Sequence, residues 1–155
     1  MEKRTEIAEV GHFGLIDRLT QGVQSVNDST VVGVGDDAAV IDAGDRYMLV
    51  STELLLEGVH FDLTYFPLKH LGYKLVVAGA SDSIAMNGTP RQVTVSIGVS
   101  ARFSVEHLEE LYEGVKAALS QNVHPPNDSV PSRLGQVKPA LTVTFCIRWP
   151  NRRLK

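Results

Sequence analysis

Hydrophobic and polar positions along this chain repeat with two different periods, and each period predicts one kind of element. Apolar side chains at helical spacing predict helices at 11–20, from about 69 to a break at 87–90, and from 104 to 119. β-Branched runs and strict alternation predict strands at 30–34, 39–41, 47–51, 93–99 and 141–149. This order of elements predicts an α+β fold in which helices pack on one face of a mixed β-sheet.

Composition changes this picture in one part of the chain. The 155 residues, 43% of them hydrophobic, are enough for one domain with its own core. Residues 121–155, however, carry 6 of the 15 Lys and Arg side chains, 1 of the 18 Asp and Glu side chains and 5 of the 7 prolines. We therefore expect a domain at 1–120 and a divergent basic tail at 121–155, in which a strand at 140–149 could complete the sheet.

Several absences in the sequence point to a cytoplasmic protein. No apolar run approaches the roughly 20 residues that span a bilayer. The first residues lack the apolar stretch of a secretory signal. A single cysteine, Cys146, excludes an intramolecular disulfide and fits a reducing compartment. The basic residues near the end of the chain are interpreted as solvated charge, so we expect neither a nucleic-acid nor a membrane partner.

Carboxylates recur where apolar runs end or are interrupted. Asp36 and Asp37 follow a predicted strand, Glu53 follows Ser51 and Thr52 at the end of another, and Asp82 lies in a helix of small and apolar residues. Burying an unpaired carboxylate is costly, so such groups need a partner. Hard cations take oxygen ligands, and several of these groups meeting in space would make a magnesium site.

The spacing alone leaves simpler interpretations open. The aspartates at 36–37 could form a solvated turn. Residues 51–53 could form the end of a strand followed by a helix cap. Asp82 could form an ion pair with Lys74 or Arg91. His60, between two apolar residues, is more often structural than a ligand. The sequence contains no Walker-type phosphate loop, no Cys/His metal spacing and no Gly-x-Ser-x-Gly motif.

The motifs taken together resemble a known enzyme family. The matching blocks are 9–16, 33–40 with Gly-Asp-Asp-Ala, 51–61 with Ser-Thr-Glu and Val-His-Phe, 71–74, and 81–86 with Ser-Asp-Ser. Over about residues 5–120 their order and spacing resemble the N-terminal domain of thiamine-monophosphate kinase. This family belongs to the aminoimidazole-ribonucleotide-synthetase-like superfamily, whose synthetases share the acidic residues but not the run that ends in Val-His-Phe.

The resemblance implies a reaction and a set of site residues. The family transfers the γ-phosphoryl group of ATP to thiamine monophosphate, which gives thiamine diphosphate, with Mg²⁺ and ATP bound. By resemblance, Asp37 ligates magnesium, Ser51 and Thr52 supply oxygens to ions near the nucleotide, Asp82 bridges ions, and His60 contacts the substrate. Glu53 stands where the family has a magnesium-binding aspartate. The resemblance also implies a homodimer in which the sheets of two copies pair.

The reaction chemistry explains why no catalytic acid or base stands out. The acceptor is itself a phosphate with a second pKa of about 6, so it is largely deprotonated at neutral pH. Catalysis then depends on positioning two polyanions and on stabilising their charge with magnesium. We therefore assign no catalytic residue and expect the acidic residues to act through metal ions.

The chain also departs from the family pattern. Glu53 is one methylene longer than aspartate, and magnesium demands near-ideal geometry. Gly79 replaces the family's asparagine, and no Gly-Gly-Asp-Thr block follows Leu119. We also expect the family's C-terminal domain to be absent. These departures predict an impaired kinase. The alternatives are a non-catalytic dimerising or nucleotide-binding remnant and an ATP-dependent synthetase of the same superfamily.

Overall fold

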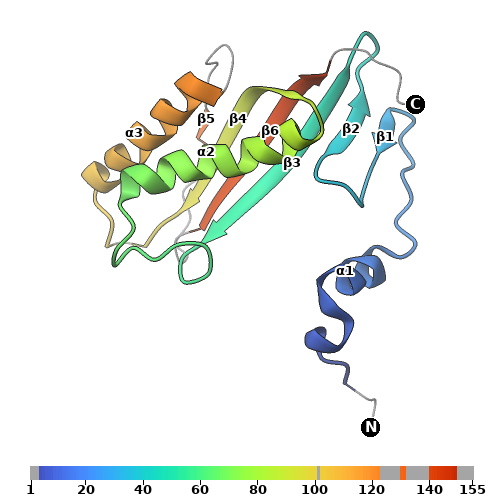
Figure 1. Ribbon diagram of the computed structural model, residues 1–155, viewed down its shortest axis with the longest axis horizontal. Coiled ribbons are helices and arrows are strands. Elements are labelled where there is room, and N and C mark those ends of the chain that lie inside the picture. The colour runs from blue at the N-terminus through green and yellow to red at the C-terminus, as the bar shows by residue number, and fades with distance from the viewer. Residues whose placement is uncertain (1–3, 101, 123–129, 132–139, 150–155) are drawn as a thin grey trace.

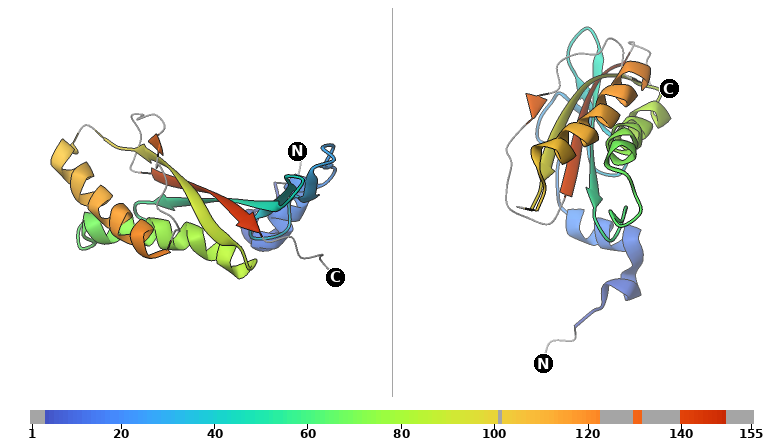
Figure 2. Two further views of the ribbon diagram at one scale, coloured as in Figure 1. Left: turned by 90° about the horizontal axis from the view of Figure 1, so that it is seen from above. Right: turned by 90° about the vertical axis from the view of Figure 1, so that its left-hand side faces the viewer.

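The computed structural model describes residues 4–100, 102–122, 130–131 and 140–149. Its elements are α1 (Ile7–Thr20), β1 (Thr30–Val32), β2 (Ala39–Asp42), β3 (Tyr47–Leu56), α2 (Leu68–Ala85), β4 (Thr89–Gly98), α3 (Val105–Asn122), β5 (Val130–Pro131) and β6 (Ala140–Trp149). One six-stranded sheet has the order β1-β2-β3-β6-β4-β5. Helices α2 and α3 lie on one face of this sheet (Figures 1 and 2), which confirms the predicted α+β class.

Strand β6 occupies the middle of the sheet, although it comes from the basic tail of the sequence. It pairs antiparallel with β3 over the whole length of both strands, from Tyr47 opposite Trp149 to Leu56 opposite Ala140. Its other edge pairs antiparallel with β4, and β4 pairs parallel with β5. The sheet is therefore mixed, and β6 joins its two halves.

Strand β3 is longer than the predicted strand at 47–51, because β6 supplies hydrogen-bond partners along its whole length. The prediction that residues 51–53 end a strand is therefore wrong, since these residues lie in mid-strand. Side chains alternate along β3: Leu49, Ser51 and Leu55 are buried, whereas Thr52 and Leu54 are exposed. Because side chains alternate between faces, Ser51 and Thr52 belong to opposite faces of the sheet.

Helix α1 lies apart from the sheet (Figure 1) and buries none of its residues. It begins at Ile7, earlier than predicted, and it is interrupted at Gly11, whose φ of 71° is in a region that favours glycine. Phe13, which contributed to the predicted apolar face, is 79% exposed. The apolar spacing identified the helix correctly, but no part of the described domain covers that face.

Strand β4 begins at Thr89, four residues before the predicted start at 93. Thr89 and Pro90 already pair with β6. Proline is tolerated at this position because the register shifts between Pro90 and Gln92. The strand therefore starts directly after the turn that ends α2.

The core forms between α2 and the sheet, and α3 packs beside α2. Its largest fully buried side chains are Leu49, Leu71, Leu75, Val40, Val76, Val93, Val95 and Val115. The two helices approach closely at Gly72 and Gly114: a β-carbon at Gly114 would overlap the Lys69 carbonyl oxygen, and one at Gly72 would overlap the Leu111 carbonyl oxygen. Among the described residues, no helix is long and apolar enough to cross a membrane.

Candidate functional site

The loop between β1 and β2 is attached to the C-terminal end of α2. The Ala38 backbone N–H donates to the Met86 Sδ atom at 3.1 Å, and Ala38 itself is buried. Asp37, the residue before Ala38, is exposed, and Asp82 lies one helical turn before Met86. The fold therefore brings together two of the predicted metal ligands that are far apart in the sequence.

The electrostatics of Asp82 show that these two carboxylates interact. Partial burial is the largest cause that raises the pKa of Asp82, and the negative charge of Asp37 raises it further. A hydrogen bond from the Ser81 hydroxyl, at 3.4 Å, acts in the opposite direction. Two carboxylates that repel one another form a site where a cation is stabilising.

Ser51 is anchored to the same turn of α2. Its hydroxyl lies 3.4 Å from the Gly79 carbonyl oxygen and 3.4 Å from the Ser83 hydroxyl. Both serines are buried, at 4% and 0% exposure. Ser83 directly follows Asp82, so Ser51 holds the middle of β3 against the part of α2 that carries this carboxylate.

Glu53 and Thr52 differ from Ser51 in their placement. Glu53 is half-buried and, two residues further along β3, shares the α2-facing side with Ser51. Thr52 is exposed on the opposite face. The side-chain oxygens of Ser51 and Thr52 therefore do not converge on one point.

His60 lies at the other end of β3, in the turn that follows the strand. Its Nδ1 atom accepts the Leu56 backbone N–H at 2.9 Å, and its carbonyl oxygen accepts the Lys74 ammonium at 2.7 Å. Because a backbone N–H can only donate, Nδ1 is an acceptor and the neutral ring carries its proton on Nε2. This exposed N–H is therefore able to donate to a ligand.

The histidine is separate from the acidic pair. Lys74, which contacts His60, precedes Asp82 by two turns of α2, about 12 Å at the rise of an α-helix. The Lys74 ammonium donates to the His60 carbonyl oxygen. Lys74 is therefore not the ion-pair partner of Asp82 that the sequence left open. The candidate site has two parts, an acidic end and a histidine end, along the same helix.

The donor set at the acidic end fits magnesium bound together with other ligands. In the described part of the chain, no group of three or more His, Cys, Asp or Glu side chains could hold a metal ion. Magnesium usually binds through one or two carboxylates and keeps waters or substrate phosphates as its other ligands. Asp37 and Asp82 meet this requirement, but they do not form an all-protein cage.

Sequence reasoning overlooked two residues near these elements. Ser83 was visible as a polar side chain within an apolar helix, but its role as the partner of Ser51 depends on the packing of α2 on β3. The Tyr112 hydroxyl is buried and has no hydrogen-bond partner among the described residues, and burial raises its pKa. The apolar spacing of 104–119 predicts the helix that carries Tyr112, but it does not show that this hydroxyl lacks a partner.

Comparison with known proteins assigns the chain to a family. The family model described as AIR synthase related protein, N-terminal domain, matches residues 35–125, and the chain belongs to this family. Within it, the chain is similar to thiamine-monophosphate kinases. It is 34% identical to that of Aquifex aeolicus over 112 residues, which are 72% of this chain and 34% of that protein. It is 34% identical to that of Bacillus subtilis over 105 residues, which are 66% of this chain and 32% of that protein.

Solved structures agree with this assignment. A structure described as AaThiL complexed with AMPPCP and TMP matches with a TM-score of 0.80 and 26% identity, over 95% of this chain and 45% of that chain. The hydrogenase maturation protein HypE of E. coli shares the fold alone, with a TM-score of 0.54 and 16% identity over 91% of this chain and 45% of that chain. The chain spans about a third of the length of the curated relatives it matches. The resemblance to the kinase N-terminal domain is confirmed.

Proposed function

We propose that this chain is the ATP- and magnesium-binding N-terminal domain of a thiamine-phosphate kinase, formed by about residues 1–120 together with β6. The observation that carries the proposal is the approach of Asp37 to Asp82 at the end of α2, where the two charges interact. Similarity to thiamine-monophosphate kinases supports the reaction class. A relative solved with AMPPCP and TMP supports ATP and thiamine monophosphate as the ligands.

Each residue of the proposed site has a distinct task. Asp37 and Asp82 hold the metal, and Ser51 positions the Asp82 turn through Ser83. Bound magnesium neutralises and orients the phosphates that must approach one another. His60 presents its Nε2–H to the phosphorylated acceptor, with its ring fixed by the Leu56 N–H. Glu53, which shares the α2-facing side of β3 with Ser51, remains a proposed metal ligand from the family resemblance, whereas Thr52 lies on the opposite face.

We further propose a homodimer that covers the sheet face opposite α2 and α3. Leu54 on β3 is 44% exposed, and Thr52 beside it is also exposed. Helices α2 and α3 lie on one face of the six-stranded sheet, and in the described part of the chain no helix packs on the other face (Figure 2). Sedimentation at micromolar concentration is the test, and a monomeric mass would count against the dimer.

The proposed kinase is impaired. Glu53 carries an extra methylene at a position where the family has aspartate, and residues 120–155 contain no Gly-Gly-Asp-Thr block. A non-catalytic nucleotide-binding module is therefore the second candidate, favoured because no group of three or more His, Cys, Asp or Glu side chains in the described residues could hold a metal ion. An assay of thiamine diphosphate formation separates the two, because such a module binds ATP without forming product.

Calorimetric titration of magnesium-ATP locates the site. We expect Asp37→Asn and Asp82→Asn each to weaken binding by about tenfold or more, which corresponds to about 1.4 kcal/mol. Asp17→Asn is the matched control, because Asp17 is exposed on the separate helix α1. Equal binding by the wild type and Asp37→Asn would remove Asp37 from the metal site.

A further inference from the structure

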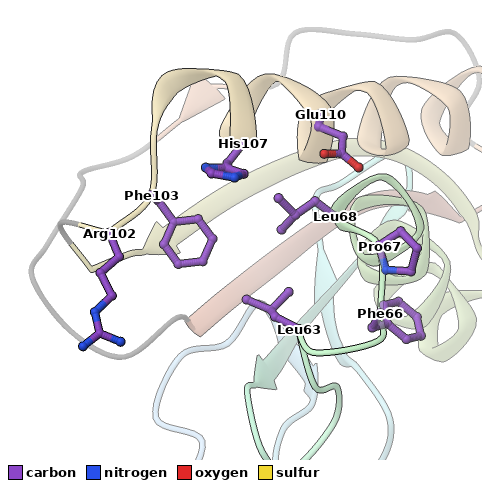
Figure 3. A pocket seen from close by; sticks show the side chains of 8 residues that line it. All are labelled: Leu63, Phe66, Pro67, Leu68, Arg102, Phe103, His107 and Glu110. Carbon is purple, nitrogen blue, oxygen red and sulfur yellow. The ribbon is translucent and has the colours of Figure 1, made fainter.

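A cavity lies at the opposite end of α2 from the acidic pair. It has a volume of about 400 Å³ and lies between the loop after β3 and the first residues of α2 and α3. Figure 3 shows its lining, which includes Leu63, Leu68, Arg102, Phe103, His107 and Glu110. Leu68 precedes Asp82 by fourteen residues of helix, about 21 Å. This cavity is therefore separate from the proposed metal site.

The floor of the cavity is apolar. Leu63 and Leu68 are half-buried and pack against the domain core. Phe103 is also half-buried, and its ring meets the His107 ring edge-on at 5.9 Å between centroids. In Figure 3 the Phe103 ring and both leucines turn toward the same space. Small-molecule sites combine such an apolar lining with a few placed polar groups.

The polar groups around this floor carry both signs of charge. Arg102 and Glu110 lie on opposite sides of the cavity in Figure 3, with Phe103 and His107 between them. The His107 Nδ1 atom accepts the Ser104 backbone N–H at 3.1 Å. The neutral ring therefore keeps its proton on Nε2, which is a hydrogen-bond donor at the cavity. The Arg102 side chain also lines the cavity and extends outward past Phe103 at its open side (Figure 3).

We propose that this cavity binds a small planar aromatic molecule that carries an acidic group at one end and an amino group at the other. The ring lies on Leu63, Leu68 and Phe103, where its burial is favourable. Arg102 pairs with the acidic group, since guanidinium and carboxylate match in geometry. Glu110 accepts the amino N–H at the far end. The site is independent of the proposed phosphoryl transfer.

The first test uses 4-aminobenzoate as a probe against the full chain, followed by NMR of backbone amides and leucine methyl groups. We expect saturable shifts centred on Leu63, Leu68, Phe103 and His107. Benzoate and aniline each lack one polar group, and we expect each to bind several-fold more weakly. The proposal would be overturned if no saturable shifts appeared up to about 10 mM probe, a concentration that corresponds to very weak binding. Equal affinity for all three probes would also overturn it.

The second test assigns the two ends of the ligand. Arg102→Gln should weaken 4-aminobenzoate and benzoate by about tenfold, or about 1.4 kcal/mol, and leave aniline unchanged. Glu110→Gln should weaken 4-aminobenzoate and aniline and leave benzoate unchanged. Glu109→Gln is the matched control, because Glu109 is an exposed neighbour on α3 that does not line this cavity. Arg102 and Glu110 are both exposed, so their substitution should leave the domain folded. Loss of folding would weaken the binding of all three probes together and would not produce this crossed pattern. Equal losses for all probes in either variant would contradict the assignment.

Discussion

Asp37 in the β1–β2 loop lies close enough to Asp82 of α2 for its negative charge to raise the Asp82 pKa. The contact that fixes this approach is the hydrogen bond from the Ala38 N–H to the Met86 sulfur at 3.1 Å. Like charges held together by the fold cost stability unless a cation or a proton joins them. The relationship therefore connects the proposed function with properties that can be measured without a substrate.

Stability should depend on pH through Asp82. Its pKa in the folded state lies above the ordinary value of 3.8, so the folded state binds the proton more tightly than the unfolded state does. The free energy of unfolding therefore falls as pH rises from about 3.8 through the folded pKa. In the absence of divalent cations Asp82→Asn should be more stable than the wild type at pH 7, and this gain should vanish below pH 3.8. Chemical denaturation across this range measures it, and an identical pH profile for both proteins would contradict the prediction.

Magnesium should make the wild type more stable than Asp82→Asn at pH 7. Ligand at 100 times its Kd stabilises a folded protein by about 2.7 kcal/mol when it binds that state alone. We expect the melting temperature of the wild type to rise with Mg²⁺ and that of Asp82→Asn to stay nearly constant. EDTA should remove the gain. A similar rise in both proteins would place the magnesium elsewhere.

The close approach of α2 and α3 makes Gly114 intolerant of substitution. A β-carbon at this position would overlap the Lys69 carbonyl oxygen, which belongs to rigid helix backbone. We expect Gly114→Ala to destabilise the domain by about 3 kcal/mol or more, at the upper end of the usual cost of overpacking. Gly14→Ala is the control, because the nearest neighbour of its β-carbon is the Val10 β-carbon at 3.7 Å. Urea denaturation should show a change below about 1 kcal/mol for the control, and similar losses in both variants would argue against the close packing.

Ser51 and Ser83 should be energetically coupled. Their hydroxyls lie 3.4 Å apart in a buried environment. Replacing either serine with alanine removes one partner and should cost about 1 kcal/mol. The double variant should cost less than the sum by about 0.5 kcal/mol. Ser120→Ala, which removes an exposed hydroxyl on α3, should change the free energy of unfolding by less than about 0.5 kcal/mol. Strict additivity in the double-mutant cycle would show that the two hydroxyls do not interact.

Local patterns predicted most of the elements correctly because helical and strand periodicity is a property of neighbouring residues. Strand alternation at 141–149 identified β6, and the apolar face after Ser104 identified α3. The same patterns placed the end of β3 too early, since its length depends on pairing with β6. They also could not show that α1 lies apart from the sheet, because exposure depends on what covers a face.

The sequence by itself determined the kinds of residue available for a magnesium site and the family in which they occur. Only the tertiary structure decided which of them meet. It brings Asp37 to Asp82 through the Ala38–Met86 contact and leaves Thr52 on the opposite face of β3. It also places His60 beside Lys74 of α2, two helical turns before Asp82. Carboxylates separated along the chain interact only when packing fixes their distance, and no local pattern contains that distance.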